Sequence, residues 1–291
     1  MHKLLLTTIA AVVLVGCVVL MWCWPSMDIY TAAGTGNIGA VKKHLDAGVD
    51  VNTKKHDING KAPLHTASRW GHTEIANLLI TAGADVNAES NSGSVPLGIA
   101  AYAGYKQIVA LLISNGANVN IKDKSGSTPL HYALHMYEPS MQHKKIIELL
   151  IANGANVNAK ENAKIIQGTT GGMSALHYSA KAGSKETTEL LISKGANINP
   201  MNTKEETPLH IAAYKGNKDT VRILIAANAN INETDKKGST PLDHALHEEN
   251  SDPLNPFFIL RMKSFESRKE VADLLRKHGG KTGEELKAEE K

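Results

Sequence analysis

Cysteine is almost absent from this sequence. The chain of 291 residues holds two cysteines, Cys17 and Cys23, and both lie near its start. The rest of the chain can therefore form no disulfide and no zinc site with cysteine ligands. Because that part holds no thiol, cysteine usage leaves the redox environment of the protein open.

Aromatic residues are also few, and the net charge is small. Only 4% of the residues are aromatic, although 42% are hydrophobic. The core must therefore be built from leucine, isoleucine, valine and alanine, which suit helices that stack closely in layers. With 32 basic and 29 acidic residues, the chain is nearly neutral, which argues against a broad surface for nucleic acid.

One long hydrophobic run lies at the start of the chain. Residues 4–24 carry no charge, follow Lys3 and end before Pro25. They are compatible with a cleaved secretory signal, with a membrane-spanning helix, which needs about 20 apolar residues, or with a lipid-anchored start. Trp22 and Trp24 suit the interface of a spanning helix. The charge of Lys3 favours export of the chain that follows.

The lipid-anchored alternative depends on a short motif. Leu14-Val15-Gly16-Cys17 resembles the lipobox of bacterial lipoproteins, a family in which this cysteine becomes the lipid-carrying first residue of the mature chain. Against it, residues 18–24 stay apolar, where a lipoprotein usually turns polar. We therefore expect residues 1–27 to be either a lipoprotein signal with lipidation at Cys17 or an uncleaved transmembrane anchor. In both cases the segment contacts a membrane.

Beyond this segment the sequence repeats itself. The leucines of six recurring segments are spaced by 33, 33, 46, 33 and 33 residues. These segments occupy residues 62–65, 95–98, 128–131, 174–177, 207–210 and 240–243. A second series, Gly-Ala-Asp/Asn-Val/Ile-Asn, closes units at 83–87, 116–120, 154–158 and 195–199. Six matches to one template indicate a solenoid of stacked units.

Each unit predicts two short helices. Threonine before proline, as in Thr207-Pro208, gives a helix N-cap followed by proline at the first helical position. A pair such as Gly216-Asn217 then turns the chain into a second helix. The glycine that closes each unit suits a left-handed cap, and Asn228 takes its place in one unit.

These openings, paired helices and closing segments together resemble the ankyrin repeat over residues 28–280. The resemblance implies an all-α solenoid of helix-turn-helix units joined by β-hairpin loops, with about six full repeats and an N-terminal capping repeat. The units lie near 28–59, 60–92, 93–125, 126–171, 172–204, 205–237 and 238–280. The charged segment 281–291 is expected to be a disordered tail. With the lipobox-like start, the chain resembles a bacterial type of ankyrin protein.

Insertions interrupt the period. The 46-residue step exceeds the repeat by 13 residues, which fall near 136–143 and 161–172. The glycine-rich run in 168–172 lacks the Lys-Ser/Thr of a phosphate loop, so we expect a surface loop there. A third insertion near 250–268 contains all three phenylalanines, Phe257, Phe258 and Phe265. It either caps the open end of the core or forms an apolar patch for a partner or membrane.

Thirteen histidines raise the question of a metal site. Four of them, His65, His131, His177 and His210, occupy the Pro-Leu-His position, which is structural in the ankyrin family. His131 and His135 have a spacing that can bind a metal, but no glutamate lies between them as in zinc hydrolases. We therefore predict no metal, no cofactor, no catalytic residue and no enzyme activity. A histidine-based metal enzyme is the second alternative function.

The resemblance also implies a binding surface. In ankyrin proteins, the hairpin tips and the variable pair after the Ala-Ala of each first helix line a concave groove. Carried over position by position, the groove residues are Arg69, Trp70, Tyr102, His135, Met136, Lys181, Tyr214 and Lys215. Tryptophan, tyrosine and arginine are the residues that most often anchor protein interfaces.

We therefore expect a monomeric, membrane-tethered scaffold on the exported side that binds another protein through this groove. A structural or spacer protein of the cell envelope without a dedicated partner is the first alternative. Nucleic acid is not expected to bind, because the lysines of the hairpin tips alternate with acidic residues such as Asp123, Glu206 and Asp235.

Overall fold

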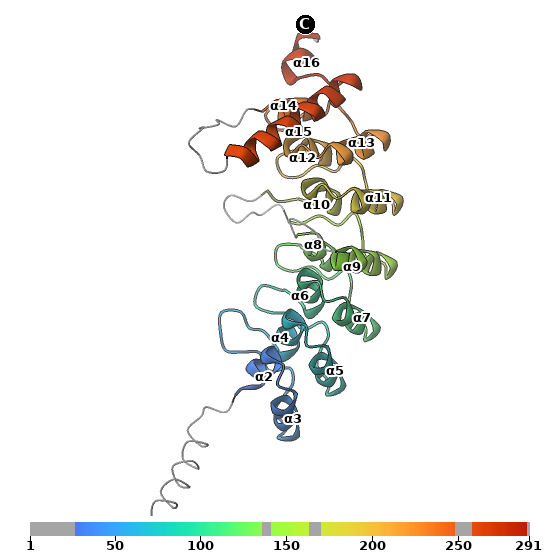
Figure 1. The fold of residues 1–291 in the computed structure, drawn as a ribbon. Coiled ribbons are helices and arrows are strands. Elements are labelled where there is room, and N and C mark those ends of the chain that lie inside the picture. The colour runs from blue at the N-terminus through green and yellow to red at the C-terminus, as the bar shows by residue number, and fades with distance from the viewer. Residues whose placement is uncertain (1–26, 136–140, 163–169, 248–257, 290–291) are drawn as a thin grey trace, which may run out of the picture.

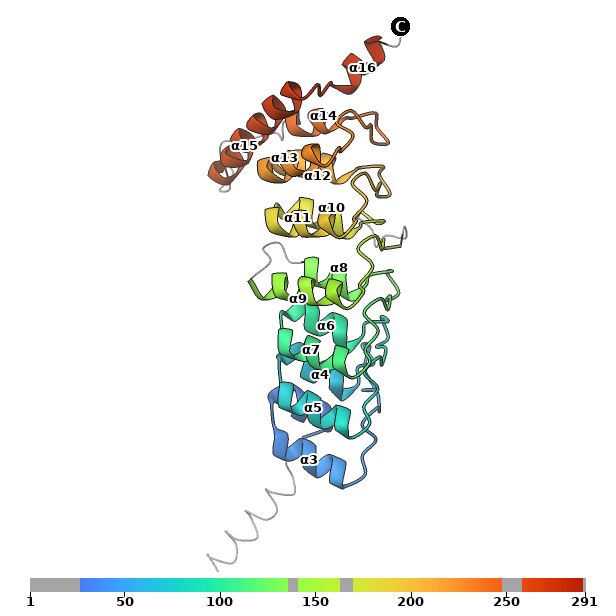
Figure 2. The same ribbon diagram turned by 90° about the vertical axis from the view of Figure 1, so that its right-hand side faces the viewer.

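Pairs of helices stack along one axis into an elongated solenoid (Figures 1 and 2). The computed structural model describes residues 27–135, 141–162, 170–247 and 258–289, with only the backbone for 258–264. The second helices lie along one side of the stack, and the loops between pairs project to the other side (Figure 1).

Two helices form each unit within the described ranges. The capping pair is α2 (Ile29–Thr35) and α3 (Ile38–Asp46). The full repeats are α4 (Pro63–Trp70) with α5 (Thr73–Thr81), α6 (Pro96–Ala103) with α7 (Lys106–Ser114), α8 (Pro129–Leu134) with α9 (Met141–Ala152), α10 (Ala175–Ala182) with α11 (Lys185–Ser193), α12 (Pro208–Lys215) with α13 (Lys218–Ala226), and α14 (Pro241–Leu246) with α15 (Phe258–Lys277). Helix α16 (Gly283–Glu289) follows. The expected six repeats and cap are confirmed.

The core is built from the first helices and from the inner faces of the second helices. Each first helix packs against the first helix of the next unit, and the six leucines of the recurring segments are at most 1% exposed. Buried alanines such as Ala67, Ala100 and Ala212 lie beside them and allow the helix backbones to approach closely. Asn228 has a positive φ of 65°, which confirms that it replaces glycine as a left-handed cap.

The histidines of the recurring segments tie each unit to the next. Nδ1 of His177 accepts hydrogen bonds from the N–H (3.1 Å) and the hydroxyl (2.8 Å) of Ser174. Its Nε2 donates to the carbonyl of Glu206 in the following unit, at 3.0 Å. His65 and His210 also bridge in this way. Burial lowers the pKa of each of these three histidines to about 4, so they are neutral at pH 7.

Asparagines form a second set of bridges along the edge of the stack. Nδ2 of Asn158 donates to the carbonyl of Gly195 at 3.0 Å, and its Oδ1 accepts the N–H of Asn197 at 2.7 Å. These bonds satisfy backbone groups at the end of the next unit's second helix. The same bridge is made by Asn52, Asn87 and Asn120.

The stack is joined least tightly where the 46-residue step falls. Helices α8 and α10 contact each other at fewer points than other neighbouring first helices do. Nε2 of the buried His131 has no hydrogen-bond partner within the described residues, whereas its counterparts in other units bridge to the next loop. The inserted residues 136–140 and 163–169 lie outside the described ranges. We call this boundary the α8–α10 seam.

The charged segment after residue 280 is folded, so the expectation of a disordered tail is wrong for residues 281–289. The hydroxyl of Thr240 donates to the carbonyl of Lys281 at 2.7 Å, and the N–H of Gly283 donates to Asp243 at 2.7 Å. Asp243 stands where other units have the bridging histidine, and it receives the C-terminal segment in place of a further repeat.

Part of the third insertion lengthens the second helix of the last repeat, so the insertion is not a loop over its whole length. Its final residues belong to α15, and Phe265 on that helix is 43% exposed. Phe265 therefore does not close the end of the core. The side chains of Phe257 and Phe258, the other two residues of the expected cap or patch, lie outside the described residues.

The loops lack the regular strands that the β-hairpin expectation implies. Within the described ranges the structure has one isolated antiparallel bridge, between Lys160 and Ser174. The loops are held by side chains instead. In the loop after α7, for example, Oδ1 of Asp123 accepts the N–H groups of Ser125 and Ser127, each at 2.8 Å.

Helix α2 begins the described fold almost directly after the N-terminal hydrophobic run. The hydroxyl of Tyr30 donates to the carbonyl of Thr53 at 2.6 Å and fixes this cap to the first loop. Among the described residues, no helix has the length and hydrophobicity needed to cross a membrane. Residues 1–26, which include Cys17, lie outside that part of the chain.

Candidate protein-binding groove

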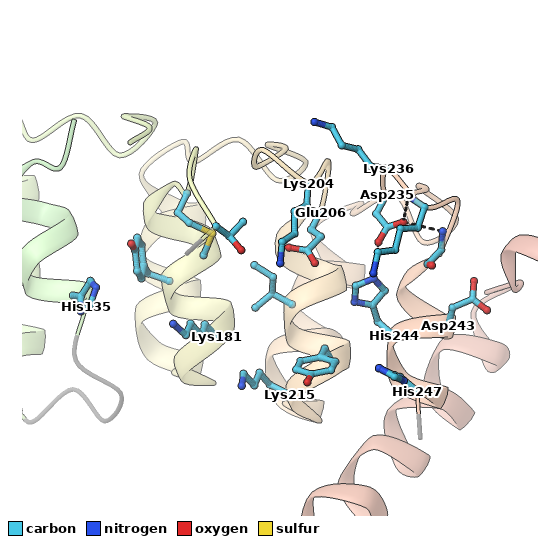
Figure 3. A pocket seen from close by; sticks show the side chains of 17 residues that line it. His135, Lys181, Lys204, Glu206, Lys215, Asp235, Lys236, Asp243, His244 and His247 are labelled. Atoms are coloured by element: carbon cyan, nitrogen blue, oxygen red, sulfur yellow. Dashed lines mark hydrogen bonds and ion pairs between the residues drawn. The ribbon is translucent and has the colours of Figure 1, made fainter. Parts of the chain in front are cut away.

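A groove of about 1090 Å³ runs along the C-terminal half of the solenoid (Figure 3). Its floor comes from the first helices α10, α12 and α14, and the loop tips near Lys204 and Lys236 border one side. Helices α10 and α12 end at Gly183 and Gly216, whose φ angles of 69° and 71° are left-handed. The chain therefore turns sharply away after Lys181 and Lys215.

Four of the eight groove residues expected from the sequence line this groove. They are His135, Lys181, Tyr214 and Lys215. Nζ of Lys215 lies 5.3 Å from the ring centroid of Tyr214, a cation–π arrangement. Met136 lies outside the described residues.

Three expected residues lie on earlier units and do not line this groove. Trp70 is 57% exposed and Tyr102 is 40% exposed, and both are large rings in a chain with few aromatic residues. The guanidinium of Arg69 lies 5.9 Å from the Trp70 ring centroid. The expected residues are thus divided between two neighbouring parts of the stack.

His135 connects these two parts. Its ring lies 6.4 Å from that of Tyr102 on one side and 5.6 Å from that of Tyr178 on the other. Tyr178 also lines the groove. It is not among the residues expected from the sequence, because it directly follows the Pro-Leu-His position inside the helix. The same position holds Tyr132 and His244 in other units, and this recurrence of polar rings could have identified Tyr178.

Those ring residues form one recurring contact with an acidic residue of the adjoining loop. The contacts join Tyr132 to Asp123 at 2.7 Å, Tyr178 to Glu161 at 2.9 Å and His244 to Asp235 at 3.0 Å. Burial, followed by the bond to Asp123, raises the pKa of Tyr132 to about 12. The acidic residues of these loops therefore hold the loop against the helix.

Glu206, Asp235 and His244 form a cluster that resembles a metal site. Each offers one ligand atom, and these atoms lie within 4.8 Å of one another. Ordinary hydrogen bonds account for their positions: His244 makes the recurring contact to Asp235, and Nδ2 of Asn202 donates to Glu206 at 2.8 Å. We assign the cluster a structural role in holding the loops against the helices.

A family model described as "Ankyrin repeats (3 copies)" matches residues 29–90, 82–161, 124–202 and 176–255. Together these matches cover most of the chain. The chain belongs to the ankyrin-repeat family. Ankyrin repeats form a scaffold for protein–protein interaction, so the expected interaction module is confirmed at this level.

Several proteins are similar to parts of this ankyrin chain. "Ankyrin repeat-containing protein P1E11.10" of Schizosaccharomyces pombe is 37% identical over 66 residues, which are 23% of this chain and 31% of that protein. Bovine "Ankyrin repeat and SOCS box protein 5" is 40% identical over 62 residues, 21% of this chain and 18% of its own length. Human "Histone-lysine N-methyltransferase EHMT1" is 35% identical over 60 residues, 21% of this chain and only 5% of the enzyme. The chain thus spans less than a third of each relative.

A solved structure confirms the arrangement of the repeats. The ankyrin repeat domain of human ASB11 superimposes with a TM-score of 0.62 at 24% sequence identity, and the match covers 82% of this chain and 96% of that domain. At this level of identity the likeness concerns the fold alone.

Proposed function

We propose that this chain is a membrane-tethered ankyrin scaffold of bacterial type that binds a partner protein, through its groove and loop tips, on the exported side of a membrane. The observation that carries the proposal is the exposed row of rings at the ends of the first helices. Trp70 and Tyr102 belong to this row, both are exposed, and tryptophan and tyrosine are residue types that often anchor protein interfaces.

The groove part of the proposal is tested by replacing its aromatic residues. We expect the combined change Trp70→Ala, Tyr102→Ala and Tyr214→Ala to abolish crosslinking of the native partner in membranes of the source organism, because aromatic anchors supply much of the binding energy of an interface. Crosslinked species would be compared between wild type and variant by mass spectrometry. A matched control replaces exposed second-helix residues, Lys145→Ala, Glu189→Ala and Arg222→Ala.

If every crosslinked protein persists in the aromatic variant, the groove is rejected as the binding surface. The alternative of a structural or spacer protein of the envelope is then favoured. Circular dichroism of both variants verifies that the helical fold is retained. The alternative of a histidine-based metal enzyme has its own test. Stoichiometric zinc in the purified protein would favour it, and the donors to examine first would be Asp235 and His244.

The tether is supported by the sequence of residues 1–27. Pro25, Ser26 and Met27 separate the hydrophobic run from the repeats, and three residues span about 10 Å even when fully extended. A membrane-anchored solenoid of this kind holds its capping helices α2 and α3 next to the lipid. The partner is therefore bound close to a membrane surface.

The two forms of tether make different predictions for Cys17. We expect the full chain to fractionate with membranes and to resist extraction by salt, because the anchor is hydrophobic. With Cys17→Ala, a lipoprotein loses incorporation of labelled fatty acid, whereas a spanning anchor keeps its membrane association and is unlabelled in both forms. Recovery of the wild-type chain in the soluble exported fraction would contradict the tether in either form.

A further inference from the structure

The groove is lined by more lysines than carboxylates. Five lysines line it: Lys181, Lys204, Lys215, Lys236 and Lys237. Two come from the ends of α10 and α12, and three come from the loop tips (Figure 3). Within the described residues, none of the five forms an ion pair with a carboxylate of the chain.

The three acidic residues of the groove are engaged by their own loops and helices. Oδ1 of Asp235 accepts the N–H groups of Lys237 (2.8 Å) and Ser239 (2.9 Å), while its Oδ2 contacts His244. These bonds lower the pKa of Asp235 although its burial opposes them, so the carboxylate is ionised and held in place.

Asp243 and Glu206 are held in a similar way. Asp243 accepts the N–H of Thr240 at 2.9 Å and the N–H of Gly283 at 2.7 Å. Glu206 accepts from Asn202, as described above. Hydrogen-bond donors of the chain thus face all three carboxylates, whereas the five lysines form no ion pair within the described residues. The alternation of acidic and basic residues along the sequence does not translate into an electrically balanced groove.

Between these charges the groove has an aromatic floor. The ring of Tyr214 lies 6.3 Å from that of His244 and 6.2 Å from that of His247, and Tyr178 lies on the neighbouring helix α10. Flat rings bordered by lysines suit an extended peptide whose carboxylates reach the lysines while an apolar or aromatic side chain rests on the rings.

We infer that this groove binds an acidic, extended segment of the partner protein. The inference rests on the proposed function and specifies the chemistry of the ligand. A single-stranded nucleic acid is less suited, because the carboxylates of Glu206 and Asp235 lie inside the groove and would repel a continuous line of phosphates. A peptide can place its acidic residues at the lysines and neutral residues opposite these carboxylates.

Binding can be measured with the full chain in detergent by fluorescence anisotropy. The probe is a short labelled peptide of glutamate and aspartate residues with one central tyrosine. Its control is the same peptide with every acid replaced by its amide. We expect the acidic peptide to bind and the amide peptide to bind at least about tenfold more weakly, with an affinity for the acidic form that falls as salt is added.

Charge reversal locates the site. We expect Lys181→Glu with Lys215→Glu to weaken acidic-peptide binding by about tenfold or more. The matched control, Lys145→Glu with Lys185→Glu, makes the same change in charge on helices α9 and α11, away from the groove, and should leave binding within about twofold. Thermal unfolding of both variants verifies that they are folded.

Equal binding of the two peptides, equal effects of the two charge-reversed variants, or tighter binding of a thymidine oligonucleotide would each overturn the inference. Its failure is distinguishable from failure of the proposed function. If the aromatic triple variant loses its crosslinked partner but the wild type does not bind the acidic peptide, the groove binds a protein of different chemistry. If the crosslinked partner persists in that variant, the groove itself is not the binding surface.

Discussion

Lowering the pH from 7 to 5 should destabilise the ankyrin solenoid strongly. His65, His177 and His210 have pKa values lowered by burial from 6.5 to about 4 in the folded state. Between these values the unfolded chain binds a proton that the folded chain does not, so stability is fully present above pH 6.5 and is lost as the pH falls towards 4. Each such histidine contributes a slope of about 1.4 kcal/mol per pH unit in the middle of this window.

The measurement is the free energy of unfolding of residues 28–291 in urea at a series of pH values. We expect His177→Gln to reduce the slope of the unfolding free energy against pH by about 1.4 kcal/mol per pH unit, which corresponds to one proton. The control His56→Gln changes a histidine that is exposed in the first loop and should leave the slope unchanged. A free energy of unfolding that stays level between pH 7 and pH 5 would contradict the buried, neutral state of these bridges.

Removal of a buried leucine should unfold one part of the stack ahead of the other. Leu112 in α7 is fully buried, and replacing a buried leucine with alanine costs about 3–5 kcal/mol. In a repeat protein each unit is stabilised mainly by its immediate neighbours. Because the α8–α10 seam joins the two halves weakly, we expect Leu112→Ala to lower the stability of residues 28–158 and to leave residues 159–289 nearly unchanged.

Hydrogen exchange followed by mass spectrometry in increasing urea resolves the two halves. The matched change is Leu224→Ala in α13, which is also fully buried and should affect the second half instead. If either substitution lowers the protection of both halves equally, the seam transmits stability as well as the other boundaries do, and the weak contacts of α8 with α10 have no thermodynamic consequence.

The architecture could be predicted from the sequence because the same local sequence pattern recurs in successive units. Threonine or serine before the first helix, proline at its first position and glycine or asparagine at the end of the second each have one dominant structural explanation. Even Asn228, an exception to the glycine rule, adopts the left-handed conformation that its side chain tolerates.

The charged tail and the groove were harder to predict because they depend on contacts between units. Nothing local in residues 281–289 shows that Asp243 and Thr240 receive them. The groove charges likewise look balanced along the chain. Only the folded loops show that Asp235 accepts several hydrogen bonds, while Lys204 and Lys236 form no ion pair within the described residues. The sequence pattern selected four residues that line the groove, but it did not indicate the electrostatic character of that face.

The closure of the C-terminal end limits how this molecule can assemble. Thr240 and Asp243 lie where earlier units bind the loop of the next unit, and here the chain's own tail occupies them: the hydroxyl of Thr240 donates to the carbonyl of Lys281 at 2.7 Å, and Asp243 accepts the N–H of Gly283 at 2.7 Å. A second copy that approached head to tail would find these two positions already filled. Open-ended growth into a filament requires such a repeating, unfilled contact. The folded tail therefore fills, within one molecule, a contact that such growth would use.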